Sequence, residues 1–141
     1  MSSECIHYEY QVPSDDFTRA GAASSDIKKK LKTMAVSPEA IRKVAIAMYE
    51  GEINMVIHAN GGTIHANIYP DYIEMILQDV GPGIPDIELA MQEGYSTATE
   101  DVHMLGFGAG MGLPNMKANS DEMKIDTVLG VGTTVTMVVK F

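Results

Sequence analysis

The chain has 141 residues, of which 45% are hydrophobic and 21% charged. This composition is typical of one globular domain and excludes a disordered tail, a collagen or a disulfide miniprotein. The formal net charge is −9, so the chain lacks the excess of basic residues that is typical of a nucleic-acid binder. No apolar run approaches the roughly 18–20 residues that span a bilayer, and the first residues lack the pattern of a signal peptide. We therefore expect a cytoplasmic protein without nucleic-acid or membrane partners.

The charges are unevenly distributed along the chain. Lysines cluster at Lys28–Lys32, which is either a solvated helix face or a binding surface. No Lys or Arg occurs between Lys43 and Lys117, a stretch that carries ten acidic residues. A phosphate ligand in this stretch would have to be neutralised by a cation or by backbone dipoles. The single cysteine, Cys5, fits a reducing compartment, and we expect it to be a small buried residue.

The hydrophobic periodicity predicts one sheet covered on one face by helices, an α/β (α+β) two-layer sandwich. Ser24 or Ser25 is expected to cap the first helix, and Ser37-Pro38 to start the second. In chain order, the predicted elements are a strand at Ile6–Val12, a helix to about Thr33, a helix from Ser37 to about Ala59, strands at Thr63–Tyr69 and Tyr72–Val80, a short helix at Asp86–Gln92, a helix at Met111–Asp121, and strands at Met123–Val128 and Thr133–Phe141.

One polar stripe lies on the long second helix. Glu50 and Asn54 are four residues apart and so share a helix face, with His58 one turn further. A carboxylate and an amide oxygen placed in this way could hold a divalent cation and accept a proton from a hydroxyl. For His58, a local hydrogen bond at the helix end is the alternative. Gly51, inside the helix, suggests close packing.

Glycine-rich segments follow at strand ends and before a helix. Asp79-x-Gly81-x-Gly83 ends a strand, where a carboxylate could accept a hydrogen bond from the amine of adenine; the alternative is an Asp-initiated turn. The alternating glycines of Gly106–Gly112 precede a helix, as in a phosphate loop or a plain loop. Gly130-x-Gly132-Thr133-Thr134 is either a hairpin turn or part of a nucleotide pocket.

The order of these motifs resembles the ATP-binding boxes of the GHKL superfamily, which includes histidine kinases, gyrase B and bacterial anti-sigma serine kinases. Glu50…Asn54 is similar to the N box, Asp79–Gly83 to the G1 box and Gly106–Gly112 to the G2 box, and Gly132–Thr134 to the closing motif. The resemblance implies the Bergerat ATP-binding fold, with a mixed, mostly antiparallel sheet. Residues 1–141 would form one ATP-binding kinase domain, with a lid at about 93–109.

The resemblance also implies roles for single residues. Glu50 would be the catalytic base, Asn54 would ligate Mg²⁺, and Asp79 would read the adenine amine with help from Gly83 and Thr134. The residues expected to contact ATP or ADP are Asn54, Asp79, Gly81, Gly83, Gly106, Gly108, Gly110, Met111, Gly112, Leu113, Thr133 and Thr134.

Among GHKL proteins, the short chain is most similar to the anti-sigma factors and serine/threonine switch kinases of bacterial partner switching. Such proteins phosphorylate a STAS-domain protein, and some bind a PP2C-type phosphatase or a sigma factor; family analogy permits a homodimer. One position departs from the pattern, because anti-sigma kinases tend to carry an arginine where this chain has Gly108. Lys117 is a candidate replacement. The alternative function is a non-catalytic, nucleotide-dependent binding module.

The eleven methionines fall into two groups. Met48, Met55, Met75 and Met137 have the spacing of core residues that fill gaps. Five others surround the predicted lid and the following helix, where either a core role or a partner-facing role is open: Met91, Met104, Met111, Met116 and Met123.

Overall fold

A computed structural model describes residues 5–13, 20–57, 59–84, 91 and 112–141. Its elements, in chain order, are β1 (Ile6–Val12), α1 (Ala22–Thr33), α2 (Pro38–Ile57), β2 (Gly62–Ile68), β3 (Tyr72–Asp79), α5 (Gly112–Ala118), β4 (Glu122–Val128) and β5 (Gly132–Lys140). The predicted helix at 86–92 and the predicted lid lie outside the described residues, apart from Met91.

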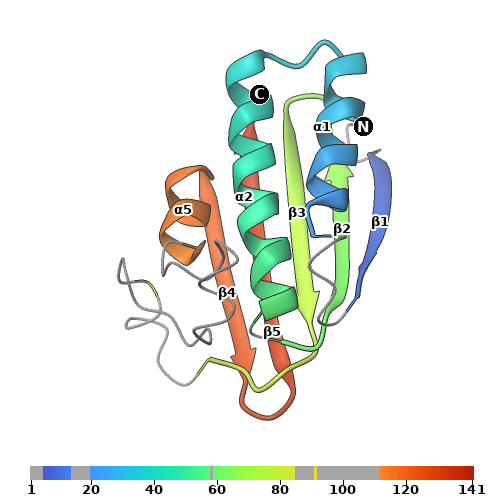
Figure 1. The fold of residues 1–141 in the computed structure, drawn as a ribbon. Helices are drawn as coiled ribbons and strands as arrows, with labels where there is room; N and C mark the ends of the chain where they lie inside the picture. The colour runs from blue at the N-terminus through green and yellow to red at the C-terminus, as the bar shows by residue number, and fades with distance from the viewer. Residues whose placement is uncertain (1–4, 14–19, 58, 85–90, 92–111) are drawn as a thin grey trace, which may run out of the picture.

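The strands form one sheet in the order β1-β2-β3-β5-β4. All four strand pairs are antiparallel, so the parallel pair implied by a mixed sheet is absent from the described strands. The three described helices lie on one face of this sheet, with α2 between α1 and α5 (Figure 1). The predicted two-layer sandwich is confirmed.

The core lies between the two layers and follows the alternation of the strands. Ile73, Met75 and Leu77 of β3 are buried under the helices, as are Val135, Met137 and Val139 of β5. Intervening residues of both strands are more exposed. The four methionines predicted to fill core gaps are buried, and Met116 of α5 joins them with 1% of its surface exposed.

The start of α1 differs from its prediction. The N-cap is Gly21 in a left-handed conformation, without a side-chain capping bond. Ser24 is buried, and its hydroxyl donates to the carbonyl of Gly21 at 3.0 Å. The free backbone N–H groups of Ala23 and Ser24 instead donate to the carboxylate of Glu52 on α2, at 3.1 and 3.2 Å. A tertiary contact therefore replaces the local serine cap.

One more helix end, and one residue expected to be buried, also differ from expectation. The start of α2, by contrast, is as predicted, with Ser37 accepting a hydrogen bond from the Ala40 N–H at 3.3 Å. Helix α5 ends at Ala118 rather than about Asp121, because the Ser120 hydroxyl donates to the carbonyl of Met116 at 2.8 Å. Cys5, expected to be buried, is exposed because it precedes the edge strand β1.

In the part of the chain that the structure describes, no helix combines the length and apolar character needed to cross a membrane.

Candidate functional site

The two polar residues of the N-box pattern lie on the face of α2 toward α5. The side chain of Asn115, on α5, lies near the Glu50 carboxylate. Partial burial raises the pKa of Glu50 above its ordinary value, and the polar Asn115 side chain offsets part of that rise. A partly buried carboxylate with a raised pKa is a candidate general base.

Asn54 lies against the first residue of α5. A Cβ atom placed on Gly112 would come 2.7 Å from Asn54 Nδ2 and 2.9 Å from Oδ1. Glycine is therefore needed there for the N-box amide to approach the start of α5 closely. The amide of Asn54 donates a long hydrogen bond from Nδ2 to Met116 Sδ, at 3.9 Å. Its Oδ1 is an oxygen of the kind that Mg²⁺ prefers, so the residue fits the expected metal.

Gly51 allows α2 to approach the sheet and α5. An added Cβ would lie 2.2 Å from Leu77 Cδ2 and 3.1 Å from Met116 Cε. The helix-interior glycine thus has the packing role that its position suggested, and it places the turn that carries Glu50 and Asn54 close to β3.

Asp79 ends β3 and is held by the next strand. The backbone N–H of Thr133 donates to Asp79 Oδ1 at 2.8 Å. Partial burial raises the pKa of Asp79, and the Thr133 hydrogen bond offsets part of that rise. A carboxylate has two oxygens that only accept hydrogen bonds. With Oδ1 bound to Thr133, Oδ2 can accept from a ligand amine.

The segment after Asp79 is fastened to the β4–β5 hairpin. The N–H of Gly81 donates to the Val131 carbonyl at 3.2 Å, and the N–H of Ile84 donates to the Thr127 hydroxyl at 2.8 Å. Gly83 has a φ of +80°, and a Cβ there would lie 2.8 Å from the Val128 carbonyl. Only glycine fits this turn without strain.

The two threonines of the closing motif lie on opposite faces of β5. Thr133 is buried on the helix side, and its hydroxyl is 2.9 Å from that of Thr127. Thr134 follows it in the strand, so its side chain lies on the other face. The resemblance implied that Thr134 assists Asp79 in the adenine contact, and this stays a prediction. The structure places the backbone N–H of Thr133 on Asp79.

Four of the predicted ATP-contacting residues lie outside the described part of the chain: Gly106, Gly108, Gly110 and Met111. His58 is outside it too. Gly112 and Leu113 are the first two residues of α5. The described site therefore consists of the α2 face, the start of α5 and the end of β3 with its hairpin.

Sequence patterns alone did not identify Asn115 and Thr127. Asn115 lies near Glu50 although the two are 65 residues apart in the sequence, and Thr127 joins Ile84 to Thr133. For Thr127, the position opposite Thr133 in a predicted β4–β5 hairpin was an available signal.

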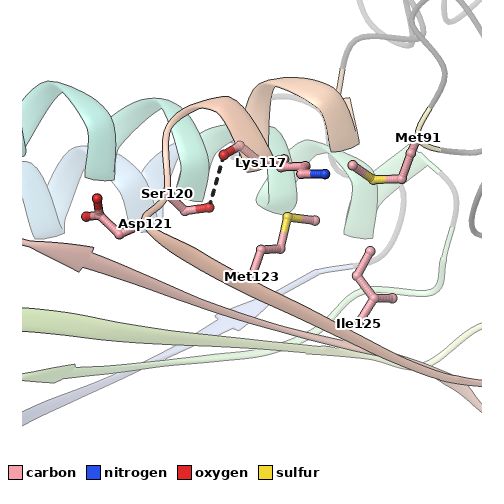
Figure 2. Close-up of a pocket in the computed structure, with 6 residues that line it drawn as sticks. All are labelled: Met91, Lys117, Ser120, Asp121, Met123 and Ile125. Carbon is pink, nitrogen blue, oxygen red and sulfur yellow. Dashed lines mark hydrogen bonds between the residues drawn. The ribbon is translucent and has the colours of Figure 1, made fainter.

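A hollow of about 390 Å³ lies between α5 and β4 (Figure 2). It is lined by Met91, Lys117, Ser120, Asp121, Met123 and Ile125. Among the described residues, none of those predicted to contact ATP lines it. Lys117, the candidate for the missing basic residue, lines this hollow rather than contacting Asn54 or Asp79 in the described structure.

Comparison with known proteins places this chain in a family. Residues 14–139 match the model of the histidine kinase-like ATPase domain. The chain is 34% identical over 95 residues to the serine/threonine-protein kinase RsbT of Bacillus subtilis (strain 168), a match that covers 64% of this chain and 65% of the kinase. Its match thus spans slightly less than two thirds of that relative's length.

Two anti-sigma F factors are also similar. The chain is 34% identical over 136 residues to the factor of Halalkalibacterium halodurans, covering 92% of this chain and 86% of the relative. With the factor of Caldanaerobacter subterraneus subsp. tengcongensis it shares 35% identity over 104 residues, covering 70% and 69%. The chain therefore belongs to the family of histidine kinase-like ATPase domains, and within it the chain is similar to anti-sigma F factors and to the serine/threonine-protein kinase RsbT.

Proposed function

We propose that this protein is an ATP-dependent serine/threonine kinase and anti-sigma regulator that phosphorylates a STAS-domain protein in partner switching. The observation that carries the proposal is the position of Glu50, a half-buried carboxylate with a raised pKa beside α5, one helical turn from Asn54. The names of the relatives, a serine/threonine kinase and anti-sigma factors, support the same activity.

The nucleotide would bind between α2, α5 and the Asp79 loop, with residues 1–141 acting as one domain and residues 93–109 as its lid. Oδ2 of Asp79 would accept from the exocyclic amine of adenine, while Oδ1 stays bound to Thr133. Guanine has a carbonyl oxygen at the corresponding position, and two acceptors would face each other. The site is therefore expected to prefer ATP to GTP.

The reaction would be a direct transfer to a hydroxyl. The substrate serine or threonine oxygen forms a bond to the γ-phosphorus, the bond from that phosphorus to the β,γ-bridging oxygen breaks, and ADP leaves. Glu50 accepts the hydroxyl proton. Asn54 would hold Mg²⁺, which neutralises phosphate charge. The proposed phosphate contacts are the backbone groups of Gly106, Gly108, Gly110, Met111, Gly112 and Leu113.

The nucleotide site is tested by calorimetric titration of ATP and ADP, with and without Mg²⁺. In Asp79→Asn, the new amide can keep its oxygen on the Thr133 N–H only by turning its NH₂ toward the adenine amine. We expect affinity to fall about 10–100-fold, the loss of a hydrogen bond to a charged group. Asp126→Asn, at an exposed carboxylate of β4, is the matched control and should bind normally. Equal affinity in both variants would refute the assigned adenine contact.

A second candidate function is a binding module that sequesters a sigma factor, a STAS-domain protein or a phosphatase and uses nucleotide only as a switch. The feature that favours it is the absence of any Lys or Arg between Lys43 and Lys117. Incubation with γ-labelled ATP and a STAS-domain partner separates the two. Label on the partner supports the kinase. A partner that binds but is never labelled supports the module.

A further inference from the structure

The face of the sheet away from the helices carries a cluster of metal-binding side chains at the β1 edge. Alternation along β1 places His7 and Glu9 on this face, and alternation along β2 places His65 and Asn67 there. In the antiparallel register, His7 lies opposite Asn67 and Glu9 opposite His65. Four polar side chains thus meet on two adjacent strands, on the opposite side of the sheet from the proposed nucleotide site.

Three of these side chains are close enough to share an ion. The nearest ligand atoms of His7, Glu9 and His65 all lie within 4.8 Å of one another. His65 Nδ1 is 3.6 Å from Glu9 Oε1. The two imidazole rings are stacked, with their centroids 5.4 Å apart and their planes at 28°. Two imidazoles and a carboxylate form the ligand set of many zinc sites.

Hydrogen bonds orient the first imidazole. Nδ2 of Asn67 donates to Glu74 Oε1 at 3.3 Å, so the oxygen of the amide faces His7. His7 Nδ1 is 2.6 Å from that oxygen. Because an amide oxygen only accepts, Nδ1 must carry the proton, and Nε2 has its lone pair free for a metal. A hydrogen bond from the second ring nitrogen is the usual support of a metal-binding histidine.

The carboxylate is oriented as well. Gln11 Nε2 donates to Glu9 Oε2 at 3.1 Å, which leaves Oε1 directed to His65. Bonds of about 2.0–2.2 Å in a tetrahedral zinc site place ligand atoms roughly 3.3–3.5 Å apart. The three side chains must therefore move together by about an ångström. His7 and Glu9 are exposed and His65 is half-buried, so no core packing opposes this movement.

We propose that His7, Glu9 and His65 form a surface site for a divalent transition-metal ion of the zinc type, with a fourth position open to water or to a donor from another molecule. Two nitrogen ligands favour Zn²⁺ over Mg²⁺, which takes oxygen ligands. The net charge of −9 favours the binding of a cation over that of an anion. This site is independent of the proposed kinase activity, because the two lie on opposite faces of the sheet.

The test is a calorimetric titration of Zn²⁺ into the full chain without a histidine tag, after treatment with a chelator. We expect one equivalent to bind, and His7→Ala and His65→Ala each to weaken binding by more than about 100-fold. Asn67→Ala, which keeps all three ligands but removes the hydrogen bond that supports His7, should weaken it about tenfold. Glu122→Gln removes an exposed carboxylate from the same face at the other edge and should change nothing.

A second measurement does not depend on variants. Long-range ¹H–¹⁵N NMR spectra of the wild type should show His7 protonated at Nδ1, with Zn²⁺ shifting the Nε2 signal of that ring.

Thermal melts of each variant without metal check that it folds. Binding only at millimolar Zn²⁺, or binding unchanged in both histidine variants, would overturn the proposal. Unaltered ATP affinity in the histidine variants would confirm that the two sites are separate.

Discussion

In its second half, helix α2 carries two carboxylates, two residues apart, that face opposite neighbours. Glu52 points to α1 and is 3% exposed, and it accepts the backbone N–H groups of Ala23 and Ser24. Glu50 faces α5, is half-buried, and has the Asn115 side chain nearby. In Figure 1, α2 stands between these two helices. The same residue type therefore has two environments within one turn.

The difference between them lies in how the burial of each carboxylate is compensated. A buried acceptor that binds two backbone donors stabilises the fold, because those donors would otherwise lack partners at the start of α1. A carboxylate that is partly desolvated with less compensation binds a proton more readily, as the raised pKa of Glu50 indicates. We therefore propose that Glu52 serves stability and Glu50 serves the chemistry, and each role can be tested separately.

The largest effect is expected for Glu50→Gln on phosphotransfer. The amide keeps the size of the side chain but cannot take the hydroxyl proton, and general bases contribute about 10²–10⁴-fold to such reactions. We expect transfer to a STAS-domain partner to fall by at least about 100-fold, with ATP affinity unchanged. Glu39→Gln, at an exposed position in the first turn of α2, is the control and should transfer normally. An active Glu50→Gln protein would remove Glu50 from the mechanism.

Glu52→Ala should have the largest effect on stability. It leaves two backbone N–H groups without an acceptor and creates a buried gap, which costs about 2–4 kcal/mol of unfolding free energy. The measurement is urea denaturation, followed by an assay of phosphotransfer at a temperature at which the variant remains folded. Full activity of the folded fraction is expected. A stable variant that has lost activity would reverse the roles of the two glutamates.

Gly51→Ala tests the contact that lies between the two glutamates. Alanine gains about 1 kcal/mol in helix propensity, but its Cβ would meet Leu77 at 2.2 Å. Overpacking of this kind costs about 1–3 kcal/mol, so we expect a net loss of roughly 1 kcal/mol. Leu77→Val removes the atoms in conflict, and the double variant should be more stable than the sum of the two changes predicts. Additive losses would show that the close approach is not needed.

The smallest effect is expected for the pH dependence of the difference in unfolding free energy between Glu50→Gln and the wild type. The pKa of Glu50 is higher in the folded state than its ordinary value of 4.5, so ionisation of the wild-type side chain opposes folding. Removing the ionisable group should therefore stabilise the protein above the folded-state pKa. This gain should disappear as the pH falls below 4.5. Denaturant titrations across that range measure it, and a gain independent of pH would contradict the assigned cause.

Sequence patterns predicted most of the fold because the relevant signals are local. The stripe from Ile41 to Ile57 has helical spacing, and the alternation of β3 and β5 buries every second residue. Helix starts were less certain. Gly21 begins α1 without a side-chain cap because Glu52, thirty residues away, supplies the acceptor. Glu52 lies on the same face of α2 as the buried residues Met48, Met55 and Val56, and this position was the available sign that its carboxylate is buried.

By itself, the sequence determined the order of the elements, the spacing of Glu50 and Asn54, and the aspartate–glycine turn at a strand end, because these depend on neighbouring residues. Only the tertiary structure decided which threonine meets Asp79, which glutamate caps α1, and that His7, Glu9 and His65 share one surface. Those outcomes depend on strand register and helix packing. Strand register and helix packing bring together side chains that are far apart in the chain. The environment of each side chain then sets its hydrogen-bond partners and its pKa.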